Sequence, residues 1–147
     1  MSYTNLGYHI VFATKERRPF LTGDVMPRLV KYIGGIIRMQ EGVLVEANGP
    51  EDHIHLVASL TPKFAISDCL RELKANSTNW IHETFASRAG FSWQEGYAAF
   101  TISRSGIDEV VRYVRNQQEH HKKSTGREEL IRLLQLHGID YDDKYIN

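Results

Sequence analysis

The sequence predicts an α+β fold, in which four strands form one sheet and two helices cover one face of it. Three observations predict it. Short segments rich in β-branched and aromatic residues are separated by two long segments with apolar residues every three or four positions. The order of these segments is strand, helix, strand, strand, helix, strand. A third helical pattern then follows the last strand, where a further helix can cover the remaining face of the sheet.

Length and composition indicate one globular domain spanning residues 1–147. The hydrophobic fraction of 41% and the charged fraction of 24% are typical of such proteins. No apolar run approaches the roughly 20 residues of a membrane span, and no export signal begins the chain, so we expect a cytoplasmic protein without a membrane anchor. Cys69 is the only cysteine, which excludes an internal disulfide and a cysteine-cluster zinc site. A net charge of zero argues against non-specific coating of nucleic acid.

The first half of the chain contains three predicted strands and one helix. Residues 8–14 form the first strand, and a helix follows over residues 22–40. Residues 43–47 form the second strand. The turn residues Asn48-Gly49-Pro50 then lead into the third strand, residues 52–60, so the second and third strands are expected to pair as a hairpin.

The second half is predicted to contain a helix over about residues 66–85 and a fourth strand over residues 93–103. A third helix begins after Ser105, which with Asp108 forms a capping-box pattern. A fourth helix runs from about residue 127 to residue 136. The first six elements have the order of a ferredoxin-like (RRM-like) βαββαβ domain. In that topology the first and third strands are central, and the two helices cover one face.

Two histidines make the third strand unusual. Side chains alternate along a strand, so His53 and His55 project from one face while Ile54 and Leu56 project from the other, towards the two helices. The two rings need partners, because an unsatisfied buried polar group costs about 1–3 kcal/mol. They are either core histidines bonded to backbone groups or two ligands of a metal ion.

The third helix carries a tyrosine that can reach these histidines. Tyr113 and Gln117 fall on the same side as Val110 and Val114, at positions i, i+3, i+4 and i+7. Docking that side on the open sheet face brings Tyr113 and Gln117 towards the histidine pair. A tyrosine can attack a phosphodiester, and a divalent ion can neutralise charge on the phosphate. His53, His55 and the Gln117 amide oxygen could hold Mg²⁺ or Mn²⁺, with Zn²⁺ left open.

His53-Ile54-His55 and the Tyr113…Gln117 pair resemble the HUH and YxxxQ motifs of the single-tyrosine transposases of the smallest insertion sequences. They are also similar to those of the relatives associated with repeated extragenic palindromes. The resemblance extends over nearly the whole chain and includes residues 8–19, 93–103 and 116–123. The two motifs lie at the expected separation and on the expected elements.

The resemblance implies an enzyme that cuts and rejoins single-stranded DNA near hairpins at the ends of an insertion sequence. It implies that Tyr113 is the nucleophile of a 5′-phosphotyrosine intermediate, and that His53, His55 and Gln117 hold the metal. It further implies a homodimer in which the tyrosine helix of one chain completes the site of the other. His120 and His121 receive no role.

Basic residues form three clusters. Each cluster is either a solvated face or a contact to DNA, and the resemblance favours DNA for those near the first strand and for Lys74. The candidate DNA-binding residues are Lys15, Arg17, Arg18, Arg71, Lys74, Arg112, Arg115 and Lys122.

Other functions fit less well. A histidine-triad hydrolase needs a third alternating histidine, but that position is Val57. Two-histidine phosphoesterases need two separate His-x-Ser/Thr motifs, and the sequence does not contain two. An RNA-binding module of this topology has no need of Tyr113 and Gln117. The remaining alternative is a domesticated HUH nuclease, or a replication-initiator-like nicking enzyme, with the same chemistry but no transposition.

Overall fold

The structure, a computed structural model, describes residues 1–120 and 122–146. Its centre is a four-stranded antiparallel sheet with the strand order β2-β3-β1-β4. The predicted topology is confirmed, and the histidine strand is one of the two central strands. The strands are β1 (Gly7–Ala13), β2 (Val43–Asn48), β3 (His53–Ser59) and β4 (Ala98–Ile102).

The fourth strand is shorter than the predicted 93–103. Trp93 makes only an isolated bridge to Thr14, and the backbone at Gly96 has φ +88°. That left-handed conformation suits glycine and interrupts an extended strand. Regular pairing with β1 therefore begins only at Ala98.

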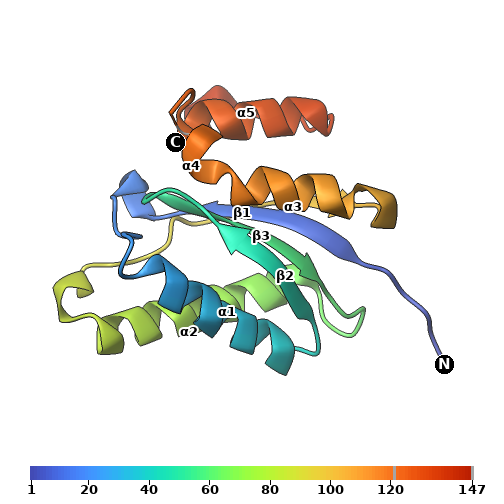
Figure 1. The fold of residues 1–147 in the computed structure, drawn as a ribbon, viewed down its shortest axis with the longest axis horizontal. Coiled ribbons are helices and arrows are strands. Elements are labelled where there is room, and N and C mark those ends of the chain that lie inside the picture. The colour runs from blue at the N-terminus through green and yellow to red at the C-terminus, as the bar shows by residue number, and fades with distance from the viewer. Residues whose placement is uncertain (121, 147) are drawn as a thin grey trace.

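One face of the sheet is covered by α1 (Met26–Met39) and α2 (Ile66–Thr84), as Figure 1 shows. Ile54 and Leu56 of β3 are fully buried on this side, together with Ile10 and Phe12 of β1. The apolar side chains of both helices complete this main core. Its helical members include Met26, Leu29, Ile33, Ile36, Ile37, Leu70, Leu73 and Ile81.

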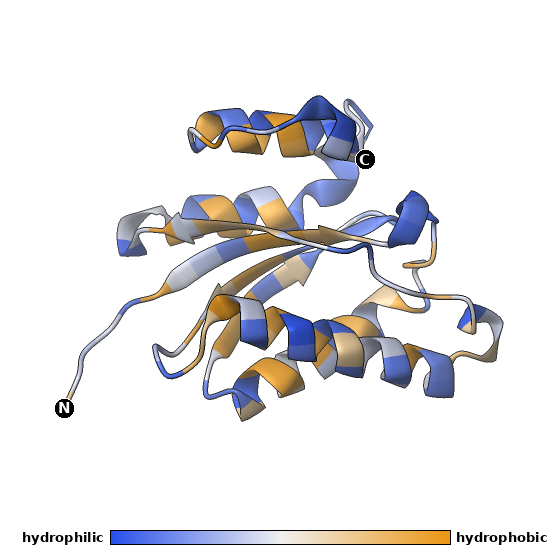
Figure 2. Cartoon of the chain, turned by 180° about the vertical axis from the view of Figure 1, so that it is seen from behind, coloured by the Kyte–Doolittle hydropathy of each residue, from blue (hydrophilic) through white to orange (hydrophobic). Residues whose placement is uncertain are grey.

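The opposite face carries α3 (Ile107–Arg115), α4 (Gln117–His120) and α5 (Gly126–Leu136). α3 lies against β2 and β3. A second apolar cluster joins Leu133 and Leu134 of α5 to Val11 and Phe100 of the sheet. Figure 2 shows the sheet, with hydrophobic and hydrophilic stretches along its strands, between the two helical layers. In the described part of the chain, no helix is both long and apolar enough to span a membrane.

The helix caps differ from the prediction. Ser105 lies inside a 3-10 turn, Arg104–Gly106, where its hydroxyl bonds to that of Ser103 at 3.2 Å, and α3 has no side-chain cap. The capping box occurs instead at the start of α5. There the Thr125 hydroxyl accepts from the Glu128 N–H at 3.1 Å, and the Glu128 carboxylate accepts from the Thr125 N–H at 3.2 Å.

Candidate functional site

The two histidines of β3 face α3 and α5, as the alternation predicts. Their exposed fractions are 2% for His53 and 0% for His55. His9 of the neighbouring strand β1 lies beside them, with its Nε2 2.8 Å from His55 Nδ1. The rings of His9 and His55 stack with centroids 5.1 Å apart. The polar side of this sheet face is thus a row of three buried imidazoles.

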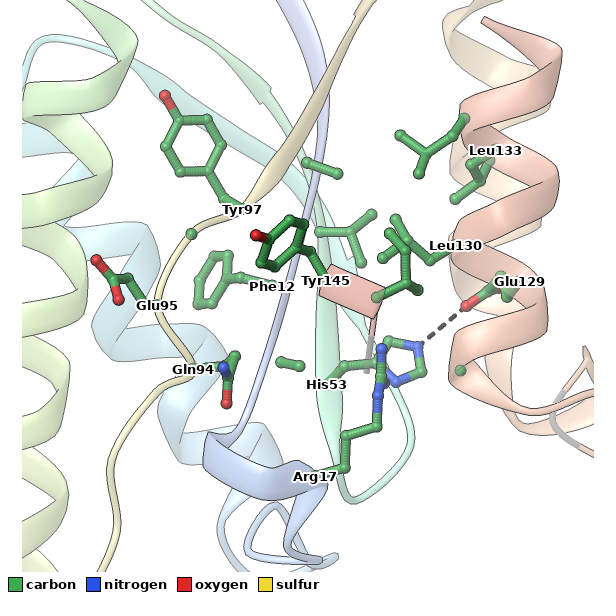
Figure 3. Close-up of a pocket in the computed structure, with 17 residues that line it drawn as sticks. Phe12, Arg17, His53, Gln94, Glu95, Tyr97, Glu129, Leu130, Leu133 and Tyr145 are labelled. Atoms are coloured by element: carbon green, nitrogen blue, oxygen red, sulfur yellow. Dashed lines mark hydrogen bonds and ion pairs between the residues drawn. The ribbon is translucent and has the colours of Figure 1, made fainter. Parts of the chain in front are cut away.

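The carboxylate of Glu129 lies at the centre of the site. Its Oε1 is 3.0 Å from His53 Nε2 and 3.0 Å from His55 Nε2. Its Oε2 accepts from Gln117 Nε2 at 3.0 Å and from the hydroxyl of Tyr113. The structure therefore brings together all four residues that the two motifs predict, around a fifth that they do not include. Figure 3 shows the contact between His53 and Glu129.

The start of α5 is built to place Glu129 there. The capping box at Thr125 fixes the first turn, and Gly126 lies against the histidine strand. A Cβ at Gly126 would collide with the guanidinium of Arg17 and would lie 3.2 Å from the ring of His53. Glycine thus permits a close approach of α5 to the sheet, and Leu133, one turn after Glu129, packs into the apolar cluster.

Asp52 orients the first histidine. Its Oδ1 lies 2.8 Å from His53 Nδ1, while Glu129 contacts the other ring nitrogen. Burial lowers the pKa of His53, but hydrogen bonds to Asp52 and Glu129 and their charges raise it, and the net shift is upward. A carboxylate that fixes the Nδ1 proton of a histidine leaves Nε2 as the atom that can bind a metal.

The hydroxyl of Tyr113 is held in its protonated form. Burial raises the pKa of Tyr113, and the hydrogen bond to Glu129 and the charge of that carboxylate raise it further. An attack by this oxygen therefore needs a base at hand. Glu129 Oε2, which already accepts the hydroxyl proton, is placed for that role.

The donor set fits a divalent metal ion. One nitrogen of His53, one nitrogen of His55 and one oxygen of Glu129 all lie within 4.8 Å of one another, and all three residues are buried. Gln117, also buried, adds an amide group beside them. Two imidazole nitrogens and one or two oxygens form a set that Mn²⁺, Mg²⁺ or Zn²⁺ can accept.

Sequence reasoning missed Glu129 and His9. A signal for Glu129 was present, because it falls four residues before Leu133 and next to Leu130, on the apolar side of its helix. A carboxylate on such a side needs partners. His9 lies in the middle of a predicted central strand, where a buried ring also needs a partner.

A cavity of about 280 Å³ opens beside His53 and Glu129, between the sheet and α5 (Figure 3). Aromatic side chains of Phe12, Tyr97 and Tyr145 line it, and the site therefore has space for part of a substrate next to the histidines.

The candidate DNA-binding residues are spread over several surfaces. Arg17 and Lys122 line one open groove beside the site. Arg71 and Lys74 belong to α2, on the other side of the sheet. Lys74 Nζ donates to the carbonyl oxygens of Gln94, at 2.8 Å, and Gly96.

The remaining candidates are exposed. Arg18 pairs with Glu16 at 3.3 Å, and Arg115 pairs with Glu46 at 2.6 Å. Lys15 and Arg112 are exposed on the turn after β1 and on α3. Their contacts with DNA stay predictions. His121 lies outside the described residues, and the side chain of His120 is likewise not described.

Comparison with known proteins decides the family. Residues 2–117 match the family model described as "Transposase IS200 like". The chain belongs to the IS200-like transposase family. The match includes β1, β3 and α3, and so also the histidine pair and Tyr113. Glu129 and α5 lie beyond the matched residues of this IS200-like transposase.

Relatives and solved structures agree with this assignment. The transposase of insertion sequence element IS200 from Salmonella typhimurium is 28% identical over 123 residues, which cover 80% of each chain. The ISDra2 transposase TnpA of Deinococcus radiodurans is 25% identical over 119 residues, covering 78% of this chain and 85% of that one.

A crystal structure of a Deinococcus radiodurans protein assigned as a transposase superposes with a TM-score of 0.65 at 26% identity. The superposition covers 79% of this chain and 93% of that one. A REP-associated tyrosine transposase bound to a REP hairpin shares the fold, with a TM-score of 0.62 at 16% identity, over 82% and 72% of the two chains.

Proposed function

We propose that this IS200-like transposase cuts and rejoins single-stranded DNA at hairpin-bearing ends, with Tyr113 as the nucleophile. The observation that carries the proposal is the convergence of the Tyr113 hydroxyl and the rings of His53 and His55 on one carboxylate. A metal-assisted attack on phosphate requires a nucleophile next to a set of metal ligands, and here a single side chain, Glu129, contacts both. The hairpin bound by the REP-associated relative supports a hairpin substrate here.

In the proposed reaction, the Tyr113 oxygen attacks the phosphorus of a scissile phosphodiester. A bond from the phenol oxygen to phosphorus forms, and the bond from phosphorus to the 3′ oxygen breaks. The phenol proton passes to Glu129 Oε2, and the 3′ oxygen leaves as a hydroxyl after taking up a proton from water. The phosphotyrosine keeps the bond energy of the phosphodiester, so a 3′-hydroxyl can reverse the step and rejoin the strand.

We propose that His53 and His55 hold a divalent ion through Nε2, with oxygens of Gln117 and Glu129 beside them. When bound, Mg²⁺ or Mn²⁺ would act as a Lewis acid on the scissile phosphate. The two oxygens of Glu129 have different proposed roles. Oε1 faces the histidines and belongs to the ligand set, while Oε2 faces Tyr113 and receives its proton.

The site supports the same chemistry in a domesticated nuclease or a nicking enzyme. Transposition is proposed because the family match and the curated relatives are transposases. The homodimer with shared sites, implied by the resemblance, stays a prediction. Within one chain, Tyr113 and Gln117 already reach the carboxylate that contacts His53 and His55, which supports a site complete in each chain.

The proposal is tested with single-stranded DNA that carries the hairpin and flanking sequence found at the ends of the element. Incubation with Mn²⁺ should give a protein–DNA adduct that survives denaturing electrophoresis. Tyr113→Phe keeps the ring but removes the attacking oxygen, so the adduct should disappear. EDTA should also prevent it.

Tyr141→Phe is the matched control, because Tyr141 is bonded to Gln135 at 3.1 Å, well after the site in the chain, and has no contact with Glu129 among the described residues. It should form the adduct at the wild-type rate. An adduct that persists in Tyr113→Phe would remove Tyr113 from its proposed role, and full cleavage in EDTA would remove the metal.

A further inference from the structure

His9 is buried beside the site, and the reaction proposed above does not use it. Its exposed fraction is 4%, and its ring lies between His55, Phe100 and Tyr113, with centroids 5.1, 5.9 and 6.0 Å away. Its Nε2 is 2.8 Å from His55 Nδ1. Two neutral imidazoles at this distance share one hydrogen bond, in which one ring donates and the other accepts.

For a neutral His55 ring, the direction of that bond follows from the contact on the other side of the ring. Glu129 Oε1 lies 3.0 Å from His55 Nε2, and an ionised carboxylate only accepts hydrogen bonds. In this arrangement the proton of neutral His55 is on Nε2. His55 Nδ1 then accepts, and His9 Nε2 donates.

Binding a divalent ion requires the opposite tautomer. A histidine that ligates through Nε2 must offer the electron pair of that atom, so its proton must be on Nδ1. His9 Nε2 must then accept instead of donating. The hydrogen bond survives the change because an imidazole can do either.

We propose that His9 is a positioning residue that supports both tautomers of His55 and so allows this histidine to bind the ion. The inference rests on the metal site of the proposed function. The His9 Nε2 proton moves to His55 Nδ1, His55 Nε2 gives its proton to water, and His9 Nδ1 takes one from water. Two protons are on the pair before and after, and neither ring becomes charged.

A comparison with Asp52, the partner of His53, explains why the partner of His55 is an imidazole. Asp52 accepts from His53 Nδ1 and cannot donate, and its side chain is 30% exposed, so water can solvate its charge. A carboxylate at the buried position of His9 would place a second negative charge close to Glu129 without solvent, which is costly. A neutral group that both donates and accepts avoids this cost.

The test compares three variants by Mn²⁺ titration calorimetry on the full-length protein without DNA. His9→Leu fills the space but cannot bond to His55, and we expect Mn²⁺ affinity to fall about tenfold or more. His9→Gln should keep an affinity close to wild type, because its amide can either donate or accept. His137→Leu is the control. It removes a ring that stacks on Phe100 from the exposed side and should not change affinity.

A second readout follows the proton itself. Nitrogen-15 NMR of the His55 ring should show the Nε2–H tautomer without metal and the Nδ1–H tautomer with Zn²⁺, used as a diamagnetic probe. This measurement on wild-type protein needs no variant to fold. A His55 ring that keeps one tautomer in both conditions would overturn the proposal, as would wild-type affinity in a folded His9→Leu protein.

The wild-type titration separates this inference from the proposed function. Wild-type protein that binds no Mn²⁺ would overturn the metal site, and with it the role of His9. Wild-type protein that binds Mn²⁺ while His9→Leu binds it equally well would overturn the role of His9 alone.

Discussion

At the scale of single residues, the site depends on one carboxylate that contacts four polar side chains. Oε1 of Glu129 lies 3.0 Å from Nε2 of His53 and 3.0 Å from Nε2 of His55, and its Oε2 accepts from Gln117 and Tyr113. An ionised carboxylate has about four acceptor positions, as many as the polar side chains that surround Glu129. The negative charge of Glu129 should therefore matter more than its size.

Glu129→Gln tests that expectation. It keeps the length of the side chain and removes the charge, and it points an amide NH₂ group at groups that also donate. We expect Mn²⁺ affinity, measured by calorimetry, to fall about tenfold or more. Adduct formation should fall as well, because the proton acceptor of Tyr113 is lost.

Glu83→Gln provides the control for loss of a charge. Glu83 is exposed on α2, on the opposite side of the sheet, and its replacement should leave both measurements unchanged. Wild-type Mn²⁺ affinity in Glu129→Gln would show that Glu129 is not a ligand.

At the scale of elements, α5 completes a site that the sheet and α3 begin. Its first turn is fixed by the capping box between Thr125 and Glu128. It presents to the sheet Glu129 and, one turn later, Leu133 and Leu134. The position of the Glu129 carboxylate thus depends on a well-ordered first turn of α5.

Thr125→Ala should loosen that start. Loss of an N-cap side chain costs about 1 kcal/mol, so the free energy of unfolding should fall by about that amount. Urea denaturation followed by circular dichroism measures it. Mn²⁺ affinity should weaken in parallel, since fraying of the first turn displaces Glu129.

Ser105→Ala is the matched control, because Ser105 does not cap α3. It should cost much less than Thr125→Ala. An equal loss of stability in the two variants would contradict the assignment of the caps.

Much of this site can be predicted from the sequence, because the side-chain repeats of strands and helices determine which residues share a face. Alternation along β3 places His53 and His55 on one face, and the helical repeat places Tyr113 and Gln117 on one side of their segment. Packing of α3 against β2 and β3 then brings the two sets together. The segment itself breaks at Asn116, so that Gln117 begins a short separate helix. The pattern does not reveal this break.

Glu129 and His9 were not predicted, for a physical reason. The position of α5 over the sheet depends on tertiary packing of Leu133 and Leu134 against Val11 and Phe100, which spacing along the chain does not determine. The role of His9 depends on register between β1 and β3, where His9 pairs opposite Val57 and its ring reaches His55 diagonally.

At the scale of the whole molecule, the sheet separates the apolar core from the polar site. The face under α1 and α2 holds the main apolar core, and the face under α3 and α5 holds the polar site. All the residues of the proposed reaction lie on the second face of a single chain.

Mixing two inactive variants tests whether sites form within one chain. Tyr113→Phe lacks the nucleophile, and His53→Ala lacks a metal ligand. If each chain builds its own site, every site in the mixture lacks one component and no adduct forms. Adduct in the mixture, with subunit exchange confirmed by mass, would show that chains share sites in a homodimer.

The most direct test of the central claim is the position of the covalent bond. Trypsin cleaves after Arg112 and Arg115, so residues 113–115 form a tripeptide with Tyr113 as its first residue. After reaction with the hairpin-bearing single strand and nuclease trimming, mass spectrometry should find the residual 5′-nucleotide on this tripeptide. A nucleotide found instead on residues 89–104, which contain Tyr97, or on residues 133–144, which contain Tyr141, would contradict the account.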